Sequence, residues 1–471
     1  MSGIAEVLLT LGYKVSGSDL KLSPITERLR TLGATVLEGH HAENVQGAEV
    51  VVTSSAIAPD NPEVLAAHKH HIPVIPRAEM LAELMRLKYG IAIAGMHGKT
   101  TTTSMVAAVL AAGNLDPTVV VGGRVDAMGS NARLGKSQYL VAEADESDRS
   151  FLRLSPILAV VTNLDREHMD CYRDMRDVMR AFRDFIERVP FYGMAILCQD
   201  DRHLRRLLPR LSRRVVTYGA GDNADFRVAL QTVEPGSVRE RPVSRFTVRY
   251  RGQDLGEFRV HVPGTHNVLN ATAAVAVGIG LDISPQHIRE ALEGFRGVDR
   301  RFQLRGTARG VAVIDDYGHH PTEVRATLAA ARSCGYRRVH VVFQPHRYTR
   351  TQLLMDEFAT AFDGADSLFI LDVYAASESP ISGVTGEALA QRIREKGSKA
   401  GKEAVYAPSF AEAAAAVASR ALEGDMILTL GAGNVSHLGS QILEQLQTQR
   451  EACLPETIIP ASHTTKKPLR P

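Results

Sequence analysis

The most informative stretch of the sequence is AIAGMHGKTTTT, residues 92–103. An apolar run ends at Gly95, and a helical pattern of apolar residues follows from Lys99 onward. We therefore predict a buried strand, a glycine turn and a helix, which is the order of a phosphate-binding loop. Backbone N–H groups at the start of such a helix hold phosphates. Lys99 can reach the β- and γ-phosphates, and the Thr100 hydroxyl can ligate Mg²⁺.

The spacing of this loop departs from the usual pattern G-x-x-x-x-G-K-[ST], because Ile93 stands where that pattern has its first glycine. A helix start with a chance lysine is the alternative interpretation. The coincidence of strand, two glycines, lysine, threonine and helix favours the phosphate loop. The ATP contacts expected here are Gly95, Met96, His97, Gly98, Lys99, Thr100 and Thr101.

Short strands alternate with helices along most of the chain, which is typical of parallel α/β sheets. The pattern restarts at Tyr89 and again near Arg300. We predict an α/β protein with an N-terminal Rossmann-like domain, a central ATP-binding domain of the P-loop type and a C-terminal Rossmann-like domain. The expected bounds are 1–88, 89–297 and 298–447, with a disordered tail at 448–471.

The first domain illustrates this alternation. Helices are expected at Gly3–Leu11, Pro24–Leu32, Asn61–His70 and Ala78–Arg86, and strands at Tyr13–Ser16, Thr35–Leu37, Glu49–Thr53 and Pro73–Ile75. In the central domain, the alternation between 237 and 262 predicts a hairpin with its turn near Gly252.

Composition narrows the class of protein. The 471 residues include 55 Lys and Arg against 53 Asp and Glu, a net charge of +2, so nucleic acid or an anionic membrane is not expected as the main partner. The four cysteines form no CxxC pair, which indicates free thiols in a reducing cytoplasm. The longest nearly apolar run, from Ala271, has about half the length of a membrane helix.

Further motifs accompany the phosphate loop. They are EADESD (143–148), TNLDREHMD (162–170), PGTHNVLNATAA (263–274), DDYGHHPTEV (315–324) and FQPHRYTRT (343–351). Together with GMHGKTTTT they resemble the Mur ligases, the amide-forming enzymes of peptidoglycan precursor synthesis, and the resemblance runs from Met1 to about Leu446. It implies a bacterial, cytoplasmic, ATP- and Mg²⁺-dependent ligase. The reaction it implies joins L-alanine to the carboxylate of UDP-N-acetylmuramate through an acyl phosphate, in a monomer or homodimer.

The resemblance also assigns metal ligands. Glu143 follows a predicted strand and matches a Mg²⁺ ligand, together with Thr100. His168 matches a ligand of a second Mg²⁺. The family commonly has Asp immediately before that histidine, whereas this chain has Glu167, which could change the hydrogen bonds around the second metal. His68, His70 and His71 are instead interpreted as a solvated helix end.

Asn267 and Asn270 lie three residues apart, so a helix start would place both amides on one face, where they suit the adenine edge. Helix capping by Asn267 is the alternative. The resemblance assigns Asp316 to the ATP ribose and Arg301 to the γ-phosphate, the latter with an interdomain salt bridge as the alternative. The substrate contacts it implies are Asp19, Ser54, Ser55, Arg77, Tyr317 and Arg347, of which the first four could equally be ordinary surface residues. The catalytic residues expected are Lys99, His319, His346 and Arg350.

In this family a strand and a glycine-rich turn, GxGGxG, precede the helix with which this chain opens. We therefore expect the first domain to lack one strand and the turn that holds the UDP pyrophosphate. Two other functions stay open. One is a recycling ligase that attaches a tripeptide to UDP-N-acetylmuramate, and the other is an ATP-binding protein inactivated by loss of that turn.

Overall fold

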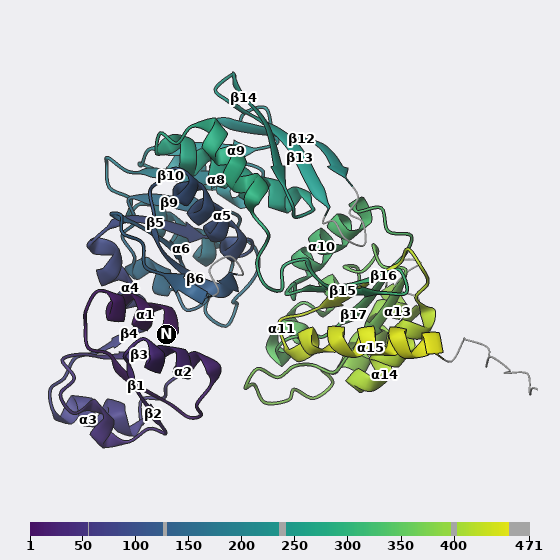
Figure 1. Cartoon of the computed structure of the whole chain (residues 1–471), viewed down its shortest axis with the longest axis horizontal. Helices are drawn as coiled ribbons and strands as arrows, with labels where there is room; N and C mark the ends of the chain where they lie inside the picture. The colour runs from purple at the N-terminus through teal and green to yellow at the C-terminus, as the bar shows by residue number, and fades with distance from the viewer. Residues whose placement is uncertain (55, 126–129, 235–241, 397–402, 452–471) are drawn as a thin grey trace, which may run out of the picture. The chain divides into compact units, whose positions relative to one another are not determined.

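The computed structural model describes residues 1–451 except 55, 126–129, 235–241 and 397–402 (Figure 1). The chain forms two compact units. The first comprises Met1–Gln303 and Asp316–Tyr336, and the second comprises Leu304–Asp315 and the chain from Arg337 onward. Among the described residues, no helix has the length and apolar character needed to cross a membrane.

The first unit begins with four helices and four short strands. They are α1 (Ser2–Thr10), β1 (Ser16–Asp19), α2 (Pro24–Thr31), β2 (Thr35–Glu38), β3 (Val51–Thr53), α3 (Pro62–Lys69), β4 (Val74–Pro76) and α4 (Arg77–Arg86), with a 3₁₀ turn η1 (Ala42–Val45). The strands form two separate parallel pairs, β1 with β2 and β3 with β4. Ser23 and Asn61 begin α2 and α3 by accepting hydrogen bonds from backbone N–H groups, as helix-capping side chains do.

The strand predicted at Tyr13–Ser16 is wrong in position. Gly12 has φ +89°, and the Tyr13 N–H donates to the Leu8 carbonyl, so these residues complete the C-terminal cap of α1. The chain becomes a strand only from Ser16, where it pairs with Thr35 of β2.

A ten-stranded sheet forms the centre of the first unit, in the order β14-β13-β12-β11-β10-β9-β5-β8-β6-β7. Its strands are β5 (Tyr89–Ala94), β6 (Thr118–Val125), β7 (Ser130–Arg133), β8 (Tyr139–Glu143), β9 (Leu158–Val161), β10 (Met194–Cys198), β11 (Val215–Gly219), β12 (Phe226–Glu234), β13 (Val243–Tyr250) and β14 (Gln253–Val260). The strand β5 pairs in parallel with β8 on one side and β9 on the other. The three strands therefore bring their carboxyl ends to one edge of the sheet.

The first unit also contains helices between and after these strands, and the two longest of them, which begin at Lys99 and Thr265, each follow a glycine. They are α5 (Lys99–Ala112), α6 (Met175–Ile186), α7 (Arg202–Leu207), α8 (Thr265–Gly280), α9 (Pro285–Gly294) and α10 (Pro321–Ser333), with 3₁₀ turns η3 (Ser150–Arg153) and η4 (Leu208–Arg210). Helices α5, α8 and α9 pack against one another. The predicted hairpin is confirmed, because β13 and β14 are antiparallel and join at Arg251 and Gly252, both with positive φ.

The second unit contains a six-stranded sheet in the order β15-β16-β20-β17-β18-β19. Its elements are β15 (Gln303–Ala308), β16 (Val311–Asp316), β17 (Val339–Phe343), α11 (Tyr348–Leu353), α12 (Met355–Phe358), β18 (Ser367–Ile370), α13 (Gly386–Lys396), β19 (Ala404–Tyr406), α14 (Phe410–Arg420), β20 (Met426–Leu430), η6 (Asn434–His437) and α15 (Leu438–Glu451). Strands β20, β17, β18 and β19 are parallel. The α/β prediction is therefore confirmed.

The last helix changes one expected boundary. A disordered tail was expected from residue 448, but α15 continues to Glu451. The helix buries Ile442 and Leu446, which anchor its C-terminal half to the unit. Residues 452–471, the rest of the expected tail, lie outside the described residues.

Candidate active site

The predicted phosphate loop is formed as expected, between the end of β5 and the start of α5. Gly95 has φ +132°, and a Cβ on it would lie 2.0 Å from Thr162 Oγ1. Gly98 has φ +83°, and a Cβ there would lie 2.7 Å from Asn270 Oδ1. Both positions therefore require glycine, for backbone conformation and for space.

The backbone of this loop is fixed by residues that follow β9. The His97 N–H donates to Asn163 Oδ1 at 2.9 Å, and the His97 carbonyl accepts from Asn163 Nδ2 at 2.9 Å and Thr162 Oγ1 at 2.6 Å. The Met96 N–H donates to the Asn163 carbonyl at 3.2 Å. These bonds hold the loop without using the His97 side chain.

Lys99 points back over the loop toward a buried carboxylate. Its Nζ donates to the Gly95 and Met96 carbonyls at 2.7 and 3.2 Å and to Glu146 Oε1 at 2.8 Å. Burial alone would lower the pKa of Lys99, but the charge of Glu146 outweighs it, and the pKa is raised above its ordinary value. Glu146, in EADESD, was missed at the sequence level, since nothing in the motif distinguishes it from its acidic neighbours.

The proposed metal ligands lie around Lys99. Glu143 ends β8 opposite Ile93 of β5, and its charge raises the pKa of Lys99. His168 Nε2 lies 3.4 Å from Glu146 Oε1, and Thr100 lies in the first turn of α5.

This donor set fits Mg²⁺. Glu146 is 1% exposed, and its Oε2 has no hydrogen-bond partner in the described part of the chain. A buried carboxylate oxygen of this kind is a ligand that a hard cation prefers. Glu143 and His168 both lie near the Lys99–Glu146 pair, and the roles of Thr100, Glu143 and His168 as ligands stay predictions.

The two asparagines lie on one face of α8, as expected. The Asn270 amide donates to Asn267 Oδ1 at 3.3 Å, and the Asn267 amide donates to the Pro263 carbonyl at 2.7 Å. The alternative of helix capping by Asn267 is wrong, because Gly264 is the N-cap of α8 and Asn267 lies inside the helix. Asn270 lies next to Gly98, so this face adjoins the phosphate loop.

Asp316 organises the loop that contains it. Its oxygens accept from the Phe302 and Gly318 N–H groups, each at 2.8 Å, and from Thr327 Oγ1 at 3.2 Å. Burial raises the pKa of Asp316, although the Arg301 charge opposes this. The predicted contact with the ATP ribose stays a prediction, and the structure gives these oxygens three internal donors.

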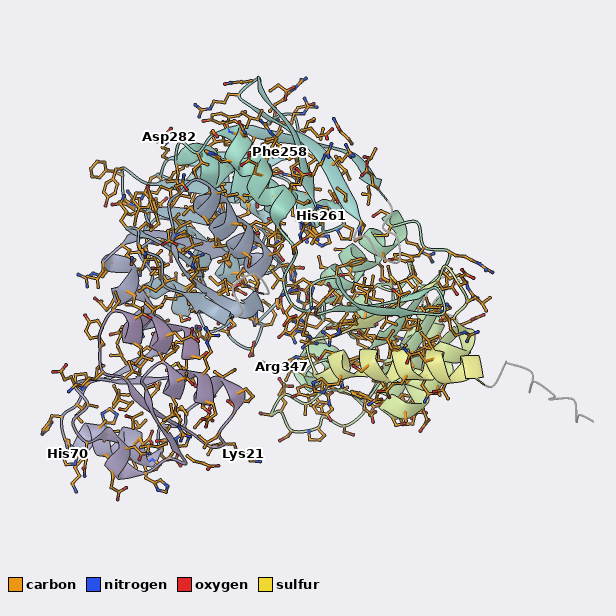
Figure 2. The ribbon with its side chains drawn as sticks, in the orientation of Figure 1. Lys21, His70, Phe258, His261, Asp282 and Arg347 are labelled. Carbon is orange, nitrogen blue, oxygen red and sulfur yellow. The ribbon has the colours of Figure 1, made fainter. Side chains whose placement is uncertain are left out.

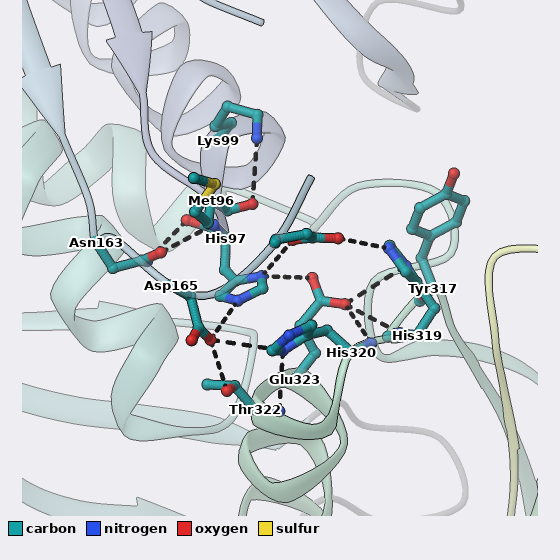
Figure 3. Close-up of polar contacts among 12 residues, drawn as sticks. Met96, His97, Lys99, Asn163, Asp165, Tyr317, His319, His320, Thr322 and Glu323 are labelled. Atoms are coloured by element: carbon teal, nitrogen blue, oxygen red, sulfur yellow. Dashed lines mark hydrogen bonds and ion pairs between the residues drawn. The ribbon is translucent and has the colours of Figure 1, made fainter. Parts of the chain in front are cut away.

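Tyr317 and His319 lie beside two arginines and two glutamates. The guanidinium groups of Arg300 and Arg301 stand 5.0 and 4.9 Å from the Tyr317 ring centre, a cation–π arrangement. His319 Nε2 lies 3.3 Å from Glu167 Oε1 (Figure 3). The longer side chain of Glu167, the noted departure from the family pattern, therefore contacts a residue expected to be catalytic.

His346, Arg347 and Arg350 lie in the second unit, after β17. Arg350 Nη1 lies 3.2 Å from both His346 Nδ1 and the His346 carbonyl, and the His346 ring stacks on Tyr374. Arg347 has φ +70°, and its N–H donates to the Tyr374 carbonyl. These contacts hold His346 and Arg350 next to each other, and their catalytic role stays a prediction.

The residues expected to contact the UDP sugar lie around the two small sheets. Asp19 ends β1 and is exposed, and Ser54 follows β3. Arg77 begins α4, and its Nη2 donates to Asp145 Oδ2 at 3.3 Å. Ser55 lies outside the described residues.

The histidines near the end of α3 behave as interpreted. His68, His70 and His71 are exposed, and His70 is labelled in Figure 2.

Models of known protein families match most of this chain. Three family models match: the Mur ligase family catalytic domain over residues 1–89, the Mur ligase middle domain over 93–278, and the Mur ligase glutamate ligase domain over 300–433. The three models follow one another along the chain, and the predicted domain bounds stay predictions.

Individual relatives cover nearly the whole chain. The UDP-N-acetylmuramate–L-alanine ligase of Koribacter versatilis is 68% identical over 452 residues, 96% of each chain. That of Acidobacterium capsulatum is 62% identical over 452 residues, again 96% of each chain. The crystal structure of the UDP-N-acetylmuramate–alanine ligase MurC from Thermotoga maritima has a TM-score of 0.77 at 28% identity, covering 95% of this chain and 97% of that one. The chain therefore belongs to the Mur ligase family.

Proposed function

We propose that this chain is an ATP-dependent ligase that joins L-alanine to the carboxylate of UDP-N-acetylmuramate in peptidoglycan precursor synthesis. The observation that supports it most is the cluster of Lys99, Thr100, Glu143 and His168 at the carboxyl ends of three neighbouring strands. Relatives with 68% and 62% identity carry the name of this activity.

The chemistry needs an activated acid, because a carboxylate oxygen is a poor leaving group. A carboxylate oxygen of the sugar attacks the γ-phosphorus of ATP and releases ADP. The alanine amine then attacks the carbonyl carbon of the acyl phosphate, loses a proton, and phosphate leaves as the amide forms. Most of the rate enhancement comes from positioning and from neutralising negative charge.

The residues of this chain divide that work. The phosphate-loop N–H groups and the Lys99 ammonium hold the β- and γ-phosphates. Thr100, Glu143 and His168 would hold Mg²⁺, which supplies positive charge to the phosphoryl group. His319, and in the second unit His346 and Arg350, are assigned to the acid and amine substrates.

The proposal also covers the cellular location and the oligomeric state. ATP and nucleotide-linked sugars are cytoplasmic metabolites, so we place the reaction in the bacterial cytoplasm. The oligomeric state, monomer or homodimer, is open to measurement by size-exclusion chromatography with light scattering.

The decisive experiment offers the purified chain ATP, Mg²⁺ and UDP-N-acetylmuramate with either free L-alanine or the recycling tripeptide. We expect ADP release and a product heavier by one alanine residue with L-alanine alone. Product from the tripeptide alone would identify a recycling ligase. ATP binding without any product would identify an ATP-binding protein that lacks ligase activity.

A further inference from the structure

A group of charged side chains surrounds His97, the residue between Met96 and Gly98 in the phosphate loop. Its Nε2 lies 3.0 Å from Asp165 Oδ2, and its Nδ1 lies 3.2 Å from Glu323 Oε1 and 3.7 Å from Glu167 Oε2 (Figure 3). The side chains of His97, Glu167 and Glu323 are 13%, 5% and 12% exposed. Asp165 and Glu167 follow β9, whereas Glu323 lies in the first turn of α10.

The charges in this group require a cation. Three carboxylates that are largely withdrawn from water are costly unless positive groups pair with them. Arg301 approaches Glu323 only to 3.9 Å. The His319 ring lies 3.3 Å from Glu167 Oε1 and 3.4 Å from Glu323 Oε2, whereas His97 faces the other oxygen of each carboxylate. A His97 imidazolium can face Asp165 with one ring nitrogen and Glu323 with the other. Burial alone would lower the pKa of His97, but Glu323 and Asp165 outweigh it and raise the pKa to about 10.

The hydrogen bonds of the neighbouring His320 favour its neutral, singly protonated imidazole form. Its ring centre lies 5.1 Å from that of His97, and burial, followed by the His97 charge, lowers the pKa of His320. Its Nδ1 accepts the Thr322 N–H at 3.3 Å as the N-cap of α10. One charged ring and one uncharged ring therefore lie side by side.

Glu323 connects His97 to the loop expected to bind substrate. Its Oε2 accepts the backbone N–H groups of His319 and His320 at 2.9 and 3.2 Å, while its Oε1 faces His97. The phosphate loop has its own support from Thr162 and Asn163. The His97 side chain is therefore a link between two loops whose backbones are held separately.

We propose that His97, as an imidazolium between Asp165 and Glu323, is a positioning residue that sets the phosphate loop against the loop of Tyr317 and His319. This inference rests on the proposed function, because it gives the link a purpose: the γ-phosphate and the acid must meet in one geometry. A misplacement of about 1 Å can cost about 100-fold in rate.

A metal ion is the competing occupant of this group. Ligand atoms of His97, Asp165 and His320 lie within 4.8 Å of one another. We favour the imidazolium, because Asp165 Oδ2 already accepts from Thr322 Oγ1 at 2.6 Å and His320 Nδ1 already accepts from Thr322.

The test compares His97→Gln, Glu323→Gln and the double variant with the wild-type chain. Glutamine at 323 can still accept from the two backbone N–H groups, so the helix cap persists while the charge is lost. Glu412→Gln is the matched control, because Glu412 contacts Ser409 at the start of α14 in the second unit and is exposed.

We expect each single variant to lower kcat by about 10- to 100-fold with the KM for ATP within about threefold of wild type. The double variant should lose no more than the worse single variant, because both changes break the same link. Wild-type kcat in His97→Gln, or losses that multiply in the double variant, would overturn the proposal.

A second readout does not depend on ligase activity. In protein with ¹⁵N-labelled histidine, at pH 8, both His97 ring nitrogens should show imidazolium shifts, assigned by their loss in His97→Gln. In Glu323→Gln the ring should move toward the neutral form. A neutral His97 in the wild-type chain, or one equivalent of Zn²⁺ or Mn²⁺ retained by wild type and lost in His97→Gln, would refute the imidazolium even if the chain proves not to be a ligase.

Discussion

Removing the Lys99 ammonium should destabilise the protein as well as abolish catalysis. Its partner Glu146 is 1% exposed, and Glu146 Oε2 has no hydrogen-bond partner among the residues described. Breaking a buried ion pair by deleting one partner costs about 3–5 kcal/mol, because the remaining charge is left uncompensated. Lys99 is itself 18% exposed and His168 lies 3.4 Å from the same carboxylate oxygen, so we expect the lower end, about 3 kcal/mol, for Lys99→Ala.

A cycle of variants isolates this effect. Urea denaturation at pH 7.5, followed by circular dichroism, would compare Lys99→Ala, Glu146→Gln and the double variant. The double variant should recover about 2 kcal/mol relative to Lys99→Ala, because a neutral amide then replaces the buried charge. Arg86→Ala is the control, since Arg86 pairs with Glu83 on the surface and should change the stability by less than about 0.5 kcal/mol.

The same cycle separates stability from chemistry. Both lysine variants should lack ATP-dependent ligation, including the double variant whose stability is largely restored. A free energy of unfolding for Lys99→Ala within about 0.5 kcal/mol of the wild-type value would contradict a buried ion pair, and so would single effects that simply add in the double variant.

Three further predictions follow from the loop and its surroundings. Gly95→Ala should abolish ATP binding in a fluorescent-nucleotide titration, because a Cβ would clash with Thr162, whereas Gly294→Ala, with open space around it, should bind normally. Glu143→Gln should raise the Mg²⁺ concentration needed for half-maximal ligation, and an unchanged Mg²⁺ titration would count against its role. The pKa of His97 is about 10 in the folded protein and 6.5 in the unfolded chain, so its stabilisation is complete below pH 6.5 and is lost as the pH rises to 10. The stability difference between wild type and His97→Gln, measured by urea denaturation from pH 6 to 10, should therefore shrink, and a constant difference would contradict this.

The parts of the fold that could be predicted from sequence are those fixed by local chemistry. The order of β5, phosphate loop and α5 follows from an apolar run, two glycines and a helical pattern, and the hairpin follows from alternation around Gly252. The first strand was misplaced because Tyr13 looks like a strand residue but closes the cap of α1. The local sequence pattern does not show where the C-terminal cap of a helix ends and where the pairing of the next strand begins.

The candidate site shows the same division. Lys99 and Thr100 could be identified as candidate site residues because they directly follow the glycines of the loop. Glu143 could be identified because it lies at the end of a predicted strand. Glu146 and Glu323 could not be selected, because their importance comes from partners about 47 and 226 residues away in the sequence, Lys99 and His97. Only the folded chain shows which carboxylate each cation meets.

The two cations of the phosphate loop, Lys99 and His97, pair with carboxylates that lie outside the loop. Lys99 pairs with Glu146, and His97 lies between Asp165 and Glu323, so each cation of the loop already has an anion. The two pairs differ in what a nucleotide can do to them. A phosphate can take over the Lys99 ammonium. The Glu146 carboxylate would then lose its ammonium partner and keep only His168 beside it, which favours binding of a divalent cation. The His97 side chain pairs with carboxylates and not with the Lys99 ammonium or the backbone N–H groups assigned to the phosphates, so its pairs can persist through that exchange. Lys99 can therefore exchange its carboxylate partner for a phosphate when nucleotide binds, whereas His97 can keep the loop in position throughout.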